Sequence, residues 1–181
     1  AIQDFEVRHE KQYLQLSGIA SSDPEDEMSL QLQDINLDYI FQTLNVNHVN
    51  FGGNATGDIS ITNLLKAPLL SSRTFDVTNF AYNDAVLGDL HLFCRFDAVT
   101  KGIFMEGNIA QEGTPDTEIR GEIYPGRDSL GLHFNAYNLN LAFLRPFVGK
   151  VMQDMSGRAT GKINFYGKFS ALTVTGDAYP E

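Results

Sequence analysis

Four histidines, His9, His48, His91 and His133, are the side chains of this sequence best suited to hold a transition metal. A zinc site needs three or four His, Cys or carboxylate ligands, and some of them usually lie a few residues apart. None of these histidines has such a partner at ligand spacing. We therefore predict no metal site, and we expect His91 and His133 to lie on the outward faces of strands.

The single cysteine, Cys94, is the next candidate for chemistry. It lies in the alternating run from Leu90 to Asp97, where a thiol behaves as a small buried apolar group. A lone cysteine forms no internal disulfide, and no histidine stands at a spacing that suggests activation of the thiol. The Gly-x-Ser-x-Gly turn of serine hydrolases is absent as well. These observations predict a protein that is not an enzyme and that carries no cofactor.

A glycine-rich motif, Gly-x-Ala-Thr-Gly, occurs twice, at residues 53–57 and 157–161. Glycine-rich turns bind phosphate when they lead into the N-terminus of a helix, as in P-loops. Here each motif leads into a strand-like Ile-x-Ile or Ile-x-Phe, and no Lys-Ser/Thr pair follows. We interpret the motif as an architectural turn. Its structural glycines are Gly53, Gly57, Gly157 and Gly161.

The acidic segment Asp23–Glu27 has the composition of a calcium loop but lacks the ligand spacing and the central glycine, so we expect a solvated hairpin tip. The whole chain is acidic, with a formal net charge of −10, and its basic residues form no cluster. Nucleic-acid binding depends on clustered Lys and Arg that release counterions, so the composition excludes it. The same charge disfavours lying flat on anionic lipid headgroups.

Alternation of apolar and polar residues dominates the sequence and predicts about ten or eleven strands. In the clearest run, Leu90, Leu92, Cys94 and Phe96 share one side of the strand. Strands with one apolar face are typical of antiparallel sheets, so we expect a mostly β fold. The other alternating groups are Leu14 and Leu16; Met28, Leu30 and Leu32; Ile59 and Ile61; Phe75 and Val77; Ile103 and Met105; Ile119 and Ile123; Leu130, Leu132 and Phe134; Ile163 and Phe165; and Leu172 and Val174.

Two stretches have helical spacing instead, and each precedes a copy of the glycine motif. Pro146 limits the second stretch to a short helix. We therefore expect one short helix per repeat. The apolar residues at helical spacing are Leu37, Ile40, Phe41 and Leu44 in the first stretch and Leu141, Leu144, Val148, Val151 and Met152 in the second.

The glycine motif belongs to an internal repeat with an offset of 104 residues, which also pairs Ile35-Asn36-Leu37 with Leu139-Asn140-Leu141. A fixed period indicates a supersecondary unit that stacks on its neighbours and extends one face. We expect approximate units at 12–110 and 116–181, the second incomplete. Because the chain starts without Met and within strand-like residues, we also expect it to be a fragment of a longer repetitive β-domain.

Each repeat consists of an apolar leader that ends in the short helix, then the Gly-x-x-x-Gly turn, then two strands separated by a glycine. The residues that carry this pattern are Leu139–Phe147, Met155–Gly167 and Ala171–Gly176, with a first copy from Asn50–Gly53 to Ala67–Leu70. The pattern resembles the C-terminal repeat region of the TamB family, the subunits of the translocation and assembly module, within the AsmA-like superfamily of bridge-like lipid transfer proteins. The resemblance covers roughly residues 12–178.

The resemblance implies an elongated, folded antiparallel sheet, the "β-taco", with an apolar concave face. It also implies a role in phospholipid transport between the inner and outer membranes and in outer-membrane biogenesis. The expected partners are phospholipid acyl chains and, through the parent protein, an outer-membrane barrel protein of the Omp85 type. The expected location is the periplasm of a Gram-negative bacterium, with the parent protein anchored in the inner membrane.

Repeated strands with the same apolar face would supply an uninterrupted lining for acyl chains. Alternation alone leaves a second interpretation open, a closed β-sandwich whose apolar faces form its core and which serves as a structural or adhesive domain that binds partners through loops. The predicted lipid-facing side chains are Leu30, Leu32, Ile59, Ile61, Phe75, Val77, Leu90, Leu92, Phe96, Ile103, Met105, Leu132, Phe134, Ile163, Phe165 and Val174.

Overall fold

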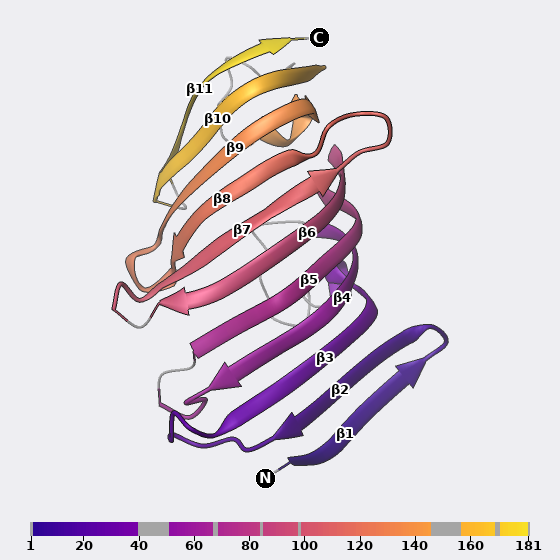
Figure 1. The fold of residues 1–181 in the computed structure, drawn as a ribbon, viewed down its shortest axis with the longest axis vertical. Helices are drawn as coiled ribbons and strands as arrows, with labels where there is room; N and C mark the ends of the chain where they lie inside the picture. The colour runs from indigo at the N-terminus through magenta and orange to yellow at the C-terminus, as the bar shows by residue number, and fades with distance from the viewer. Residues whose placement is uncertain are drawn as a thin grey trace.

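The computed structural model describes residues 2–39, 51–66, 69–83, 85–97, 99–145, 157–168 and 171–180. These residues form one antiparallel sheet of eleven strands, in which every strand pairs with its neighbours in the chain (Figure 1). The strands are β1 (Ile2–His9), β2 (Gln12–Gly18), β3 (Glu27–Asn36), β4 (Phe51–Thr62), β5 (Leu69–Tyr82), β6 (Ala85–Asp97), β7 (Gly102–Ala110), β8 (Thr117–Tyr124), β9 (Ser129–Asn140), β10 (Arg158–Lys168) and β11 (Ala171–Pro180). Two 3₁₀ turns, η1 (Pro125–Arg127) and η2 (Leu141–Leu144), connect strands.

The sheet is elongated and open. The edge strands β1 and β11 lie at opposite ends of the stack (Figure 1), and each pairs with a single neighbour. The sheet also folds over itself, since β6 contacts β9 and η2 although neither is its sheet neighbour. The prediction of a folded antiparallel sheet with an apolar concave face is thus confirmed. The closed β-sandwich is wrong, because all eleven strands belong to one continuous sheet whose edge strands, β1 and β11, do not pair with each other.

Strand register explains why the apolar residues share one face. Residues opposite each other in an antiparallel pair project from the same side of the sheet. Leu30 pairs with Ile59, and Phe75 pairs with Leu92. Each predicted alternation therefore continues the face of the strand before it, and apolar rows run across the sheet.

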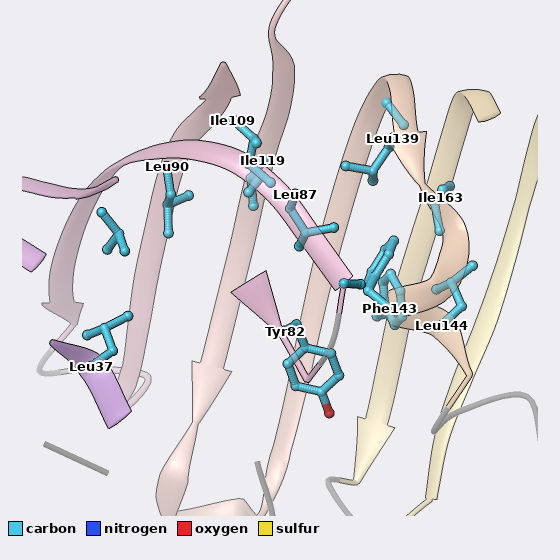
Figure 2. Packing of buried hydrophobic residues seen from close by; sticks show 14 of the residues in the cluster. Leu37, Tyr82, Leu87, Leu90, Ile109, Ile119, Leu139, Phe143, Leu144 and Ile163 are labelled. Carbon is cyan, nitrogen blue, oxygen red and sulfur yellow. The ribbon is translucent and has the colours of Figure 1, made fainter. Parts of the chain in front are cut away.

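The buried part of the concave face lies near one end of the strands. Leu90 and Ile109 are paired across β6 and β7, and Ile119 of β8 lies in the next row of the same face. Phe143 and Leu144 of η2 pack close to Ile163 (Figure 2). Phe143 also contacts the rings of Phe134 and Phe165, with centroids 6.1 and 5.6 Å away. Short helical segments thus cover this end of the apolar face from within the fold.

The predicted helices are short where the structure describes them. Residues 37–39 are helical, and Leu141–Leu144 form η2, whose first turn is capped by the Asn140 side chain. The remaining apolar positions of both stretches, within 40–50 and 146–156, lie outside the described residues. One strand has no counterpart in the prediction. β1 alternates Phe5 and Val7 with polar residues, as β2 does with Leu14 and Leu16, and it adds one strand to those predicted.

The two copies of Gly-x-Ala-Thr-Gly lie at the start of β4 and β10, opposite the same β-bulge, and they form extended strand and not the predicted turn. In β3, Leu32 pairs with Gly57 and Ile35 with Ala55, so β3 carries one extra residue; β9 and β10 repeat this arrangement 104 residues later. The extra residue has positive φ in both copies, 54° at Asp34 and 49° at Asn138. The motif threonine accepts a hydrogen bond from that residue's N–H at 3.0 Å, Thr56 from Asp34 and Thr160 from Asn138.

The residue types of the motif suit its position opposite the bulge. The threonine hydroxyl replaces the ladder partner that the bulge removes. The alanine is 0% exposed at Ala55 and 1% at Ala159, where a larger side chain would not fit. At the second glycine, a Cβ would lie 2.2 Å from a carbonyl oxygen of the adjacent strand, at both Gly57 and Gly161. The boundaries of the repeat units at 12–110 and 116–181 stay a prediction.

We expect Thr160→Val to lower the free energy of unfolding by about 1–2 kcal/mol, because the Asn138 N–H in the bulge loses its acceptor. Urea denaturation measures the change. Thr74→Val is the matched control: Thr74 is an exposed strand residue, and its replacement should change stability by less than about 0.5 kcal/mol. Equal effects of the two substitutions would contradict the proposed role of the hydroxyl.

Glycines where neighbouring backbones approach closely should tolerate no side chain. A Cβ at Gly107 would lie 2.0 Å from the His91 carbonyl oxygen, whereas a Cβ at Gly131 would meet nothing within 4 Å. We expect Gly107→Ala to destabilise the fold by at least about 2 kcal/mol, because the strands must separate. Gly131→Ala should be neutral or slightly stabilising. The melting temperatures of the two variants decide the point, and similar values would refute it.

Candidate functional site

The structure places all sixteen predicted lipid-facing residues on the concave face of the sheet, which we call the trough. None of them is fully exposed. Buried members are Leu32, Val77, Leu90, Ile163 and Phe165, and the other eleven are half-buried. These side chains are thus neither fully enclosed in a core nor exposed on a surface. They line the concave side of the sheet.

One row of the trough crosses all eleven strands without a polar side chain. It is built from directly paired residues of successive strands, so its members lie side by side. Glycines occupy three of its positions, where the backbone itself forms the surface of the trough. The row consists of Val7, Leu14, Leu32, Gly57, Phe75, Leu92, Gly107, Ile119, Phe134, Ile163 and Gly176.

The trough becomes shallower from one end of the strands to the other. Near η2, Val77, Leu90 and Ile109 are 1%, 6% and 1% exposed. At the opposite end, a row from β6 to β11 is half-buried throughout and comprises Phe96, Ile103, Ile123, Leu130, Gly167 and Leu172. We call the η2 end the plugged margin. The end formed by the hairpins β2–β3, β4–β5, β6–β7, β8–β9 and β10–β11 is the open margin (Figure 1).

The convex face of the sheet is polar and makes cross-strand pairs. Nδ1 of His91 lies 2.9 Å from the Asp76 carboxylate, and Arg120 donates to Glu106 at 2.5 Å. His133 lies 2.7 Å from the Asn164 side chain. His91 and His133 therefore occupy the outward positions expected for them. Among the described residues, no group of three His, Cys, Asp or Glu is arranged to hold a metal ion.

Cys94 lies on the floor of the trough, where it pairs with Ser72 on one side and Met105 on the other. Burial in this apolar setting raises the pKa of the thiol to about 11. A thiol with so high a pKa is almost entirely protonated near neutral pH, and it therefore serves as an apolar lining group. The reactivity of the Cys94 thiol therefore reports how accessible the floor of the trough is.

A second concavity lies on the convex face over β1–β5, with a volume of about 930 Å³. Its lining includes Gln31, Asp58 and Thr74, and the Arg8 guanidinium lies over the Tyr13 ring at 4.7 Å. This concavity is lined mainly by polar and charged side chains, so it suits an acyl chain less well than the trough does.

Sequence reasoning omitted some residues of the trough from the predicted lining. Ile109 is 1% exposed and belongs to the apolar cluster, but it belongs to no predicted strand pair. The signal was present, because Ile109 continues the alternation of Ile103 and Met105 through Gly107. Leu14, Leu16, Ile119, Ile123 and Leu130 were assigned to strands but not to the lining, and all face the trough.

No protein-family model, curated protein or solved structure matches this chain. Within the described residues, no helix combines the length and apolar character needed to cross a bilayer. Function is therefore inferred from the geometry of the trough and from the pattern of the sequence.

The raised pKa of Cys94 predicts slow alkylation by iodoacetamide at pH 7–8. The rate should rise about tenfold per pH unit up to a pH near 11, because only the thiolate reacts. The matched control is the double variant Cys94→Ser/Phe93→Cys, which moves the thiol to the convex face, where Phe93 is 38% exposed. Its rate should level off more than one pH unit lower. Identical profiles would show that Cys94 is not buried in the trough.

Proposed function

We propose that this chain is a non-enzymatic segment of a cell-envelope lipid conduit, in which the trough holds the acyl chains of phospholipids. The observation that carries the proposal is the apolar row that crosses all eleven strands. A pocket for one small ligand would be enclosed on several sides and would carry a few convergent polar groups. The trough instead offers the same apolar chemistry from one edge strand to the other.

The energetics favour a continuous lining over a single pocket. Exposing an acyl tail of about sixteen carbons to water costs on the order of 12 kcal/mol, at ~0.8 kcal/mol per CH₂. A lipid that crosses an aqueous compartment therefore needs apolar contact along its whole path. The polar convex face, with pairs such as Asp76–His91 and Glu106–Arg120, keeps such a structure compatible with water.

The resemblance to the TamB family supplies the cellular setting of the proposal. In that setting the parent protein is anchored in the inner membrane of a Gram-negative bacterium and extends through the periplasm. It carries phospholipid between the two membranes and acts with an outer-membrane barrel protein of the Omp85 type in outer-membrane biogenesis. The open, folded sheet with its apolar concave face agrees with this proposal.

Native mass spectrometry of the gently extracted protein tests the proposal, with co-purifying phospholipid as the expected result. Leu92→Gln should fold but retain at least about fivefold less lipid, because Leu92 is a half-buried residue of the trough floor. Phe93→Gln changes the adjacent residue on the convex face and should retain lipid normally. Circular dichroism confirms folding of both variants.

Two outcomes would contradict the conduit. The first is a lipid-free mass of the unmodified protein across several mild detergents. The second is equal lipid retention by Leu92→Gln and Phe93→Gln. Either result would favour a purely structural role, in which the apolar face serves only as the internal packing of the domain.

A further inference from the structure

The internal repeat gives the trough two equivalent pieces of floor. Each piece joins two paired strands in the same register, β3 with β4 in the first copy and β9 with β10 in the second. The first floor segment consists of Leu30, Ile59 and Ile61, and the second floor segment consists of their counterparts 104 residues later, Phe134, Ile163 and Phe165. A comparison of the two segments shows how the same surface is treated in each copy.

The second floor segment is covered by side chains of the protein itself. The ring centroid of Phe143 in η2 lies 6.1 Å from that of Phe134 and 5.6 Å from that of Phe165. Leu144 packs in the same cluster, close to Ile163 (Figure 2). Phe143 is 5% exposed, and Ile163 and Phe165 are each 4% exposed. The Phe143 ring therefore takes up the apolar contacts that this part of the trough has to offer.

Backbone hydrogen bonds hold η2 in this position. The Ala142 N–H donates to the Asn140 side chain at 3.0 Å, and the Leu141 N–H donates to the Gly157 carbonyl oxygen at 3.0 Å. The Arg145 N–H donates to the Ala142 carbonyl oxygen at 3.2 Å. None of these bonds uses the Phe143 side chain, so its truncation removes the cover and keeps the bonds of the turn.

The first floor segment has no comparable cover among the described residues. Tyr39 is the counterpart of Phe143 at the same offset, and residues 37–39 are helical, yet Tyr39 is 64% exposed. Ile59 and Ile61 are half-buried at the positions where the second copy has buried side chains. The two copies of the repeat thus present the same piece of trough floor once covered and once uncovered.

The uncovered floor continues from the first segment to the edge strand β1. Leu30 pairs with Leu16, and Leu16 pairs with Phe5, which is 55% exposed. In the other direction, Ile59 pairs with Ser72 of β5, a buried residue whose hydroxyl is hydrogen-bonded within its own strand. The accessible apolar strip therefore spans β1–β4 and is bounded by a polar side chain at β5.

We infer that phospholipid acyl chains bind to the trough over β1–β4, and that Phe143 excludes them from the equivalent floor over β9 and β10. The inference rests on the proposed function and assigns it to one part of the trough. In the second copy an apolar side chain already fills the place in question. Because apolar contact is non-directional, methylene groups can make the same contact with the first floor segment.

Photo-cross-linking locates the bound acyl chains in the unmodified protein. The probe is phosphatidylcholine with a diazirine in one acyl chain, presented in vesicles of unlabelled phosphatidylcholine. The vesicles are removed by flotation after illumination, and labelled peptides are identified by mass spectrometry. We expect labelling of β1–β4 to exceed labelling of β9 and β10 at least about fivefold, because the Phe143 ring occupies the apolar surface there.

Phe143→Ala should raise the labelling of β9 and β10 at least about fivefold, since the second floor segment regains its free apolar surface. Labelling of β1–β4 should stay as it is in the unmodified protein. Tyr39→Ala is the matched control, because it removes the aromatic side chain at the same position of the first copy, where that side chain is 64% exposed. This control should leave both labelling levels unchanged, and circular dichroism confirms that both variants fold.

Equal labelling of β1–β4 and β9–β10 in the unmodified protein would overturn the inference, whether or not Phe143→Ala folds. Unchanged or lower labelling of β9 and β10 in folded Phe143→Ala would overturn it as well. Both results leave the proposed function standing, whereas the absence of any labelled peptide and of retained lipid would overturn the proposed function itself. A lipid-free dimer in native mass spectrometry that disappears in Leu30→Gln would make the uncovered floor a contact between two copies and refute acyl binding there.

Discussion

Strand register is the constraint on which the trough depends, because paired residues of an antiparallel sheet project from the same face. A slip of one residue in any strand would turn its apolar side chains outward. The sequence contains an extra residue in β3 and again in β9, and the bulges at Asp34 and Asn138 absorb it. The motif threonines hold these bulges in place. Local pairing thus produces a face that stays apolar across the whole sheet without a closed core.

The apolar face is covered by the protein itself at one margin and left partly exposed at the other. At the plugged margin, Phe143 and Leu144 of η2 are each 5% exposed and pack against the sheet, so the protein supplies its own cover there. At the open margin, the row that includes Phe96, Ile103 and Ile123 is only half-buried. The buried margin provides the cohesion that a single open sheet lacks. The other margin has no comparable cover among the described residues.

Much of the fold was predictable because alternating apolar and polar residues are typical of a sheet with one apolar face. The strands with Leu90–Phe96 and Leu130–Phe134, and the shared face itself, follow from it. The bulges were not predictable, because the glycine motif that contains Thr56 and Thr160 indicates a turn, and the hydrogen-bond partners of these threonines lie 22 residues away in the sequence.

The boundaries of the trough argue for an elongated occupant. η2 closes one margin, and charged hairpins border the other, but the apolar rows continue to both edge strands. At β1, Phe5 and Val7 are 55% and 49% exposed, and at β11, Val174 is half-buried. Phe143 of η2 packs over Phe134 of the continuous row, and the same aliphatic and aromatic contacts recur on the strands to either side. An acyl chain would therefore find similar contacts at successive positions along the sheet, with no single deep minimum. Such an even surface suits movement along the sheet better than tight capture at one point.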